Sequence, residues 1–413
     1  MRIERLGDLG TPSEVLRTVG DATTGRRLPP PAALTGEWFG SQAVIAPSVL
    51  AAPVGVTEVF NVSAGARSGV VGGGWIGYLS YPDPGADGAG ARIPAAAGGW
   101  TDCVLRRDFS GQWWFESLSG APMPDWLNQA LHAPTPARDC HIYWEPPDRQ
   151  SHRAGVLACL EAIRAGEVYQ ACLCTRFTGR VTGAPLDFFA DAVQRTGPAR
   201  AAYVAGQWGA VASLSPELFL RRHGEVVTSS PIKGTLPRYA RPSALRASAK
   251  DVAENVMIVD LVRNDLGRVA ITGSVTVPEL LSVQPAPGVW HLVSTVAARV
   301  PEQLSMPALL DATFPPASVT GTPKHRARQL LSVWEQNRRG IYCGTVGLAS
   351  PVAGVELNVA IRTVEFDAHG GAVLGVGGGI TADSCVDAEW QECLHKAASI
   401  VAVDHSRERN TAS

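Results

Sequence analysis

At residues 231–238 the sequence reads PIKGTLPR, which places Lys233 between two prolines and directly before Gly234. Proline restricts φ and glycine permits positive φ, so this composition predicts a short, rigid and irregular turn. An amine held in such a turn could attack an electrophilic carbon when it is deprotonated. When protonated it could equally bind an anion as a point charge. The stretch itself leaves both roles open for Lys233.

The composition of the whole chain is that of an ordinary globular protein. Its 413 residues are 45% hydrophobic and 18% charged, and the net charge is −2. Such a small charge gives no reason to expect nucleic acid or an anionic membrane as a partner. The chain has no apolar run of about 20 residues, and its first residues lack the apolar segment of a signal peptide. We therefore expect a cytoplasmic protein without a membrane span.

Eight cysteines are scattered along the sequence, and no two of them form a C-x-x-C pair. This spacing does not indicate a zinc site. In a chain of this size the cysteines are expected to be reduced, mostly buried thiols, as is usual in the cytosol.

Composition and hydrophobic periodicity divide the chain into three parts. Residues 1–145 are rich in alanine, glycine and proline, and the glycine run at 72–78 is typical of the start of a strand. Residues 146–403 show clearer periodicity, and 404–413 form a polar tail that we expect to be disordered. Helices are predicted at 153–166, 250–267, 308–312 and 323–338, and a last helix is predicted from Ser384 to about 403, with Asp387 as the capping-box partner of Ser384. Strands are predicted at 225–229, 273–277, 344–349, 357–366 and 372–376. We predict a loop at 82–100 and a connection at 139–149.

Two of the predicted helices carry carboxylates three residues apart. Asp251 and Glu254 share one helix face, and Glu389, Glu392 and Lys396 share a face of the last helix. Two such pairs on separate helices can converge to hold a hard cation such as Mg²⁺ through oxygen ligands. Two solvated helix faces with ordinary salt bridges account for the same spacing, and the spacing alone favours that simpler reading.

Three features suit the binding of a carboxylate. The run GVGGG at 375–379 follows a predicted strand, and the backbone N–H groups of such a turn can approach an anion closely. Its spacing fits neither a dinucleotide fingerprint nor a P-loop, and a plain tight turn is the alternative. Arg362 lies in an apolar strand and needs an anionic partner or an edge position. Tyr342 could share that anion or could be a core aromatic residue.

Two further residues have side chains suited to proton transfer. Glu217 lies among apolar neighbours, and burial would raise its pKa and suit it to the role of a general acid. A glutamate at a strand edge is the alternative. His291 lies in an apolar stretch, where a histidine is more often a satisfied core residue than a catalyst.

Taken together, these motifs occur in the order and spacing of one family. The sequence resembles the chorismate-utilising enzymes, and within them the large-subunit (component I) group of aminodeoxychorismate synthases. The resemblance covers roughly residues 150–403, and the run at 72–78 resembles the N-terminal region of the same family. The motifs lie at 166–170 with 176–177, 215–220, 231–238, 251–269, 290–296, 314–328, 339–347, 358–363 and 375–396.

The resemblance implies an α/β (α+β) fold like that of anthranilate synthase component I, with a large antiparallel β-sandwich flanked by helices. It makes 1–145 the N-terminal region and 146–403 the chorismate-binding catalytic domain, with Mg²⁺-bound chorismate in a central cleft. It assigns catalysis to Lys233, Glu217 and His291, substrate binding to Gln170, Gly234, Thr235, Tyr342, Arg362, Gly377, Gly378 and Lys396, and the metal to Glu254 and Glu392 with Asp251 and Glu389 in support.

Members of this family differ in the group that attacks the chorismate ring. Those that add water carry a lysine where this chain has Gln170, and glutamine cannot act as a base. Anthranilate synthases carry a small residue where this chain has Lys233. The resemblance therefore implies that Lys233 attacks C2 while Glu217 protonates the departing C4 hydroxyl, after which ammonia attacks C4 and expels the lysine. The implied product is 4-amino-4-deoxychorismate, which supplies p-aminobenzoate to folate or to a specialised metabolite.

The sequence has no Gly-x-Cys-x-Gly nucleophile elbow, so ammonia is expected from a separate glutaminase subunit. Three alternatives remain: an anthranilate synthase component I, an aminodeoxyisochorismate synthase, and a catalytically silent chorismate-binding subunit. Two positions depart from the family pattern. Cys172 stands where asparagine is usual, and Pro315-Pro316 replaces a turn that commonly contains glycine.

Overall fold

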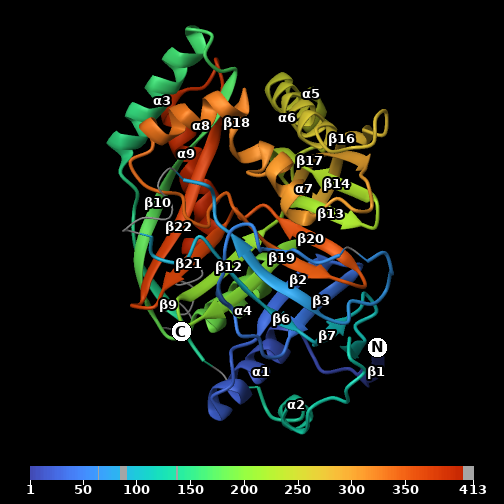
Figure 1. Cartoon of the computed structure of the whole chain (residues 1–413). Helices are drawn as coiled ribbons and strands as arrows, with labels where there is room; N and C mark the ends of the chain where they lie inside the picture. Colours follow the sequence, from blue (N-terminus) through green and yellow to red (C-terminus); the bar gives the residue numbers. More distant parts are fainter. Residues whose placement is uncertain (64, 84–90, 136–137, 403–413) are drawn as a thin grey trace.

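Two antiparallel β-sheets form the centre of the molecule, and helices cover them (Figure 1). The structure is a computed structural model that describes residues 1–63, 65–83, 91–135 and 138–402. Within these residues one sheet has twelve strands and the other has ten. This architecture confirms the predicted α/β (α+β) class with its antiparallel sandwich flanked by helices.

The first sheet combines strands from the beginning, the middle and the end of the chain. Its strand order is β1 (Arg2–Gly7), β8 (Trp113–Ser117), β7 (Cys103–Arg107), β3 (Ser41–Ala46), β2 (Ala32–Trp38), β11 (Arg200–Gly206), β12 (Gly209–Ser215), β21 (Thr363–Asp367), β22 (Gly371–Ile380), β10 (Gln170–Thr182) and β18 (Gly321–Thr322), and β9 (His141–Glu145) also pairs with β10.

The second sheet is composite in the same way. Its order is β15 (Ile232–Pro237), β17 (Val289–Arg299), β14 (Val226–Ser230), β13 (Leu218–His223), β20 (Gly354–Asn358), β19 (Thr345–Ser350), β5 (Gly74–Leu79), β6 (Ala96–Thr101) and β4 (Ala52–Pro53), and β16 (Thr276–Ala286) also pairs with β17. Strands from both sides of the predicted boundary at residue 145 therefore share both sheets. The predicted tail at 404–413 lies outside the described residues.

The helices form three groups. Near the N-terminal strands, α1 contacts α2 and α4; α3, α8 and α9 gather along the long strands β10 and β22; and α5, α6 and α7 lie beside the second sheet (Figure 1). Over the described ranges, no helix combines the length and the apolar character that a membrane span requires. The bounds are α1 (Pro12–Arg26), α2 (Asp125–Leu131), α3 (Arg149–Arg164), α4 (Pro185–Thr196), α5 (Ser243–Ala247), α6 (Ala249–Gly267), α7 (Met306–Thr313), α8 (Lys324–Trp334) and α9 (Val386–Val401), with a 3₁₀ turn at Ala317–Val319.

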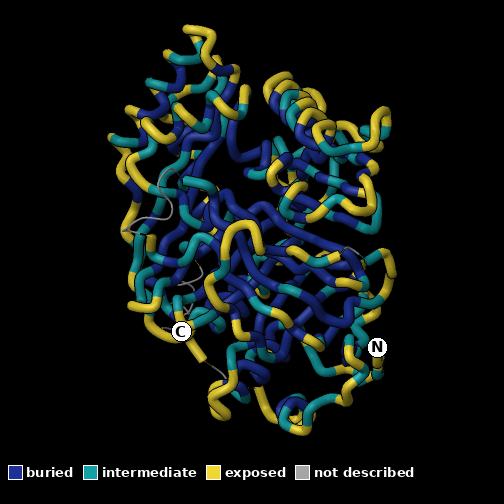
Figure 2. Tube along the Cα trace, viewed as in Figure 1, coloured by how far each residue is buried: buried dark blue, intermediate teal, exposed yellow. Residues whose placement is uncertain are grey.

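The core follows from the two-residue period of the strands. In β11, Ala201 and Tyr203 pack in the cluster that includes α1 and α4. The alternate residues Ala202 and Val204 pack in a second cluster with residues of β5 and β19 from the other sheet. Successive side chains of a strand point to opposite faces, so both faces of this strand are buried. Figure 2 shows the same result for the whole molecule, with buried segments through the centre and exposed ones at the periphery.

Helix α6 matches the prediction at 250–267 closely. The Ser248 hydroxyl caps it by accepting a hydrogen bond from the backbone N–H of Asp251, at 3.2 Å, and the helix ends at Gly267. This cap fixes the first turn, which carries Asp251, and Glu254 follows in the next turn.

Several predicted boundaries were wrong. The connection predicted at 139–149 contains β9, because this segment pairs with β10. Of the loop predicted at 82–100, residues 84–90 lie outside the described residues and the last five belong to β6. The strand predicted at 273–277 is β16, which begins later, at Thr276. The helix predicted at 323–338 is α8, which ends earlier, at Trp334. The strand predicted at 357–366 is interrupted, because the chain crosses there from β20 in one sheet to β21 in the other.

Candidate active site

Lys233 lies in a β-bulge. In β15, Ile232 pairs with Val293 and Thr235 pairs with His291, so three steps on one strand match two on the other. The extra residue falls at Lys233 and Gly234, where Gly234 takes a positive φ of 88°. The predicted rigid turn was therefore wrong as an element, because the segment joins a sheet. A bulge locally redirects the strand, and this one presents Lys233 from the sheet edge.

The run at 375–379 is also strand rather than turn, because β22 continues through it to Ile380. Its glycines leave room for groups packed on both faces of the strand. A Cβ on Gly375 would lie 2.2 Å from Cγ of Tyr342. One on Gly378 would lie 3.1 Å from Oε2 of Glu389. The glycines of this stretch therefore serve close packing of side chains rather than a change of chain direction.

Gly379 marks the point where three of the predicted site residues meet. A Cβ at this position would lie 3.6 Å from Nζ of Lys233, 3.6 Å from Oε2 of Glu254 and 3.7 Å from the amide carbon of Gln170. These residues come from β15, α6 and β10, which are far apart in the sequence. The structure thus brings together the lysine, a carboxylate and the amide that the sequence singled out.

Three polar groups of the candidate site have no hydrogen-bond or ion-pair partner within the described part of the chain. Gln170 is fully buried, and neither its amide nitrogen nor its amide oxygen makes a hydrogen bond. The amine of Lys233 and the guanidinium of Arg362 form no hydrogen bond or ion pair there. Buried polar groups are normally paired, because an unmade hydrogen bond costs free energy. The buried, unpaired amide of Gln170, with the half-buried Lys233 and Arg362 also unpaired, is an arrangement expected of a site that receives a polar ligand.

The predicted acidic residues lie beside two lysines. Nζ of Lys396 is 2.7 Å from Glu392 and donates to the backbone oxygen of Gly377 at 2.8 Å. Nζ of Lys250 is 3.5 Å from Glu389 and 3.9 Å from Glu254. Lys250 links α6 to α9 through its ion pair with Glu389, and Glu254 and Glu389 are buried rather than solvated, while salt bridges occupy both helix faces as the simpler alternative expects.

The pKa values of these carboxylates differ. Burial raises the pKa of Glu254, against the effect of Lys233 and Lys250, and the nearby Glu392 adds to the rise. Burial would also raise the pKa of Glu392, but Lys396 and Lys250 hold it below its ordinary value. The pKa values of these two carboxylates are thus shifted in opposite directions although both belong to one cluster.

These residues fit a divalent cation by their chemistry. They offer carboxylate oxygens, which Mg²⁺ prefers, and the buried Oε2 of Glu389 has no hydrogen-bond partner. Across residues 1–402 as far as described, no three His, Cys, Asp or Glu side chains stand together as a ready-made metal site. Lys250 and Lys396 balance the negative charge in this arrangement. Asp251 belongs to the same region, since a Cβ on Gly234 would lie 3.1 Å from it.

Glu217 is buried between β12 and β13, with 3% of its surface exposed. Burial raises its pKa to about 7, while the nearby Ser318 hydroxyl and the amine of Lys233 pull in the opposite direction. At neutral pH this carboxyl group is therefore protonated about half of the time. It has the acidity of a general acid, and it lies close enough to Lys233 to be influenced by its charge.

His291 and Thr235 face each other across β15 and β17. Oγ1 of Thr235 lies 2.9 Å from Nδ1 of His291. Burial lowers the pKa of His291 to about 4, and the positive charge of Arg362 contributes to this. The imidazole is therefore neutral at pH 7 and can accept or donate one hydrogen bond. Arg362 itself lies between β20 and β21 with a left-handed φ of 51°, so its predicted place inside a strand was wrong.

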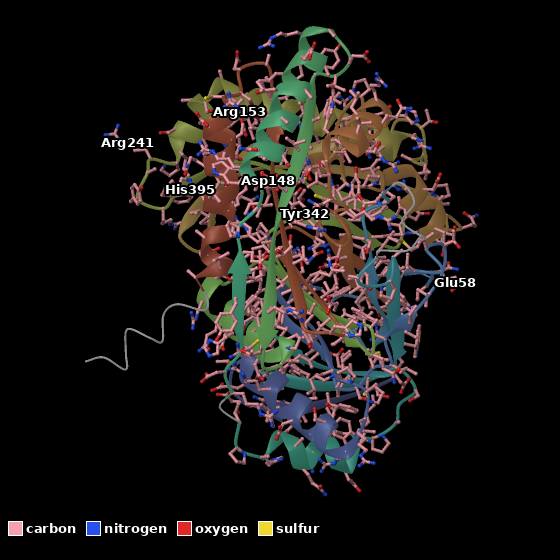
Figure 3. All side chains as sticks on the ribbon, turned by 90° about the vertical axis from the view of Figure 1, so that its left-hand side faces the viewer. Glu58, Asp148, Arg153, Arg241, Tyr342 and His395 are labelled. Atoms are coloured by element: carbon pink, nitrogen blue, oxygen red, sulfur yellow. The ribbon has the colours of Figure 1, made fainter. Side chains whose placement is uncertain are left out.

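Tyr342 is buried in the interior, in the turn before β19 (Figure 3). Its ring lies against Gly375, and burial raises the pKa of its hydroxyl well above the usual value. The hydroxyl is therefore a neutral hydrogen-bond donor at any physiological pH.

Sequence reasoning missed two residues of this site. Lys250 precedes Glu254 by one helical turn, and this i,i+4 spacing could have revealed it. Ser384 was predicted to begin α9, but the N-cap residue is Cys385, which makes no side-chain cap. The Ser384 hydroxyl instead donates to Oε1 of Glu389 at 2.6 Å. No local sequence pattern indicates this bond. Glu389 is also bound by Lys250, which lies on another helix.

Comparison with known proteins agrees with this geometry. The model of the chorismate binding enzyme family matches residues 74–402. Aminodeoxychorismate synthase component 1 of Escherichia coli (strain K12) is 42% identical over 248 residues, which are 58% of this chain and 54% of the relative. Aminodeoxychorismate synthase of Streptomyces pristinaespiralis is 36% identical over 368 residues, 80% of this chain and 50% of the relative. Anthranilate synthase component 1 of Arthrobacter globiformis is 37% identical over 259 residues, 60% of this chain and 48% of the relative.

Among solved structures, anthranilate synthase component I from Streptococcus pneumoniae superposes with a TM-score of 0.72 and 25% identity, covering 90% of both chains. The chain spans about half the length of the curated relatives that it matches. The family model covers most of the chain, including every residue of the candidate site. The chain therefore belongs to the chorismate binding enzyme family.

Proposed function

We propose that this chain converts chorismate and ammonia to 4-amino-4-deoxychorismate, as an aminodeoxychorismate synthase component. The observation that carries the proposal is the position of Lys233, whose amine stands unpaired beside Gln170 and Glu254. A free amine at the centre of a polar site suits a nucleophile, whereas Gln170 cannot activate water. The names of the similar enzymes from Escherichia coli and Streptomyces pristinaespiralis support the same activity.

The proposed substrate carries two carboxylates, and the site offers cationic and donor groups for them. The unpaired guanidinium of Arg362 can bind one carboxylate through two parallel hydrogen bonds. Tyr342 and Lys396 supply further donors, and on this proposal Gly377 and Gly378 of β22 contact the substrate through their backbone. On this proposal Thr235 and Gly234 border the ring.

The proposed chemistry runs in two displacements. The amine of Lys233 forms a bond to C2 of chorismate, the double bond shifts, and the C4 hydroxyl leaves as water with a proton from Glu217. Ammonia then forms a bond to C4, the double bond shifts back, and the C2–N bond to Lys233 breaks. The pKa of Glu217, about 7, supports its role as the proton donor. Because His291 is neutral, it can lie beside the ring without adding a positive charge to the site.

Magnesium is the proposed metal, held by Glu254 and Glu392 with Asp251 and Glu389 in support. When bound it would neutralise a substrate carboxylate, which is the contribution that carboxylate-held Mg²⁺ makes in such sites. The unsatisfied oxygen of Glu389 supports this assignment.

The proposed source of ammonia is a separate glutaminase subunit, which the designation "component 1" of the Escherichia coli relative supports. The product would supply p-aminobenzoate for folate or a specialised metabolite. All eight cysteines are free thiols, which supports a cytoplasmic location.

The decisive experiment is product analysis. The purified chain is incubated with chorismate, Mg²⁺ and an ammonium salt, and the product is identified by chromatography and mass. 4-Amino-4-deoxychorismate is expected. Anthranilate would instead identify the activity named for the Arthrobacter globiformis relative, and the absence of any turnover would indicate a silent chorismate-binding subunit.

A further inference from the structure

A cavity of about 230 Å³ lies between the loop that follows α8 and the N-terminal strands. Its lining includes three arginines, Arg92, Arg176 and Arg338, and two acids, Asp83 and Glu365. None of the residues placed in the candidate active site lines it. The cavity is therefore a second polar site, and its charge is not explained by the proposed reaction.

Both acids of the cavity are already engaged. Oε1 of Glu365 accepts hydrogen bonds from Arg92, at 2.8 Å from Nε, and Oε2 accepts from the backbone N–H of Ile341 at 3.3 Å. Asp83 accepts from the backbone N–H of Gly340 at 3.0 Å. These contacts fix the loop that leads to Tyr342, and the charge of Asp83 also acts on the nearby Arg338 without a direct ion pair.

Two arginines remain without a direct partner among the described residues. The half-buried Arg176 makes no hydrogen bond or ion pair there, and partial burial together with the nearby charge of Arg92 lowers its pKa against the opposing effect of Glu365. Nη1 of Arg338 is buried and makes no hydrogen bond. Arg338 also lines a neighbouring cavity of about 430 Å³, in which His325 and Arg328 add further basic groups.

A buried guanidinium is costly unless an acceptor satisfies its N–H groups and an anion balances its charge. Water can satisfy the N–H groups, but the three arginines of the cavity still outnumber its two acids. We propose that the cavity is a binding site for a small acid, whose carboxylate or phosphate group is held between Arg176 and Arg338. The volume lies below the ~300 Å³ at which ordinary ligand pockets begin, so a compact ligand fits best. Guanidinium groups match both kinds of oxyanion through paired hydrogen bonds.

The test is a calorimetric titration of the full chain with inorganic phosphate and, separately, with succinate, which distinguishes the two oxyanion classes. We expect at least one probe to bind. Arg176→Gln and Arg338→Gln should each weaken that binding roughly ten- to hundredfold, the loss expected for a charged hydrogen-bonding partner. The matched control is Arg241→Gln, because Arg241 projects into solvent away from the body of the protein (Figure 3). It should bind like the unmodified chain.

Two further variants keep the result interpretable. Arg176→Lys retains the charge but loses the paired geometry, so it should show an intermediate loss, and it decides the matter if the glutamine variant does not fold. Arg362→Gln removes the guanidinium of the candidate active site and should leave the binding of the probe unchanged. The proposal is overturned if neither probe binds, if both cavity variants bind as well as the unmodified chain, or if Arg362→Gln is the change that abolishes binding. It stands independently of the proposed reaction, because no step of the titration requires turnover.

Discussion

Replacing Gly375 by alanine tests the packing of the site with a single methyl group. The new Cβ would lie 2.2 Å from Cγ, 2.5 Å from Cδ1 and 2.6 Å from Cβ of Tyr342. Carbon atoms pack best at about 3.5–4.0 Å, so the ring has to retreat by more than about 1 Å. The backbone at Gly375 does not have a positive φ, so the substitution adds no backbone strain of its own.

The size of the effect follows from the burial of Tyr342, which is 7% exposed and packed in the cluster around α6 and β20. Overpacking a filled core costs about 1–3 kcal/mol, and contacts on three atoms of one ring place this variant at the upper end. If Tyr342 binds a substrate carboxylate, its displacement should also raise the KM for chorismate about tenfold, the value of one hydrogen bond to a charged group. Urea unfolding measures the first quantity and steady-state kinetics the second.

Gly25→Ala is the matched control, because it adds the same methyl group in α1 where nothing lies within 4 Å. It should leave the KM unchanged and stabilise the chain by up to about 1 kcal/mol through helix propensity. A Gly375→Ala variant as stable as the unmodified chain would refute the packing argument. A destabilised variant with an unchanged KM would remove Tyr342 from the substrate site while leaving the packing argument intact.

Three further predictions concern the chemistry. Lys233→Ala and Lys233→Arg should both reduce turnover by orders of magnitude, and full activity in either variant contradicts a covalent route. When the unmodified protein is trapped with chorismate, mass analysis should find the adduct on the peptide that contains Lys233. For Glu217, burial raises the pKa from 4.5 to about 7, so the native state holds its proton more tightly than the unfolded state and the residue costs stability as the pH rises through this range. In urea titrations, Glu217→Gln should therefore be more stable than the unmodified chain by about 3 kcal/mol at pH 8 and nearly equal to it at pH 4. Rate assays should find the variant inactive. A stability difference that does not depend on pH would contradict the assignment. Removing divalent cations with EDTA should abolish turnover reversibly, with Mg²⁺ restoring it, and Glu254→Gln should weaken this rescue at least tenfold; unchanged rates in EDTA would exclude the proposed metal role.

The sequence predicted best those elements whose signals are local. Helix α6 was found within one residue at its start because its apolar positions, its polar first turn and its terminal Gly267 all lie within one stretch. The spacing of the carboxylates predicted that Glu254 lies near the acidic residues of α9. In the structure Lys250 connects them, because its amine lies near both Glu254 and Glu389.

The errors share one cause, which is that a partner distant in the sequence decided the local conformation. The glycines at 375–379 suggest a turn until Tyr342 and Glu389 are known to lie against them, after which strand is the only conformation that accommodates both. The bulge at Lys233 exists only because His291 and Val293 fix the register of the neighbouring strand. The sequence around Arg362 is typical of a strand, but the residues before it belong to β20 of one sheet and those after it belong to β21 of the other.

The choice of basic residues argues further for the role of Lys233. The sequence has 36 lysines and arginines, of which only four are lysines, at 233, 250, 324 and 396. Arginine binds oxyanions at least as well as lysine, but its guanidinium cannot lose a proton in proteins, whereas the amine of lysine can. The other three lysines form ion pairs with carboxylates, whereas the amine of Lys233 forms none within the described residues. In the proposed reaction, Lys233, which lies near Gln170 and Glu254, is the residue that attacks carbon, and arginine could not replace it in that role.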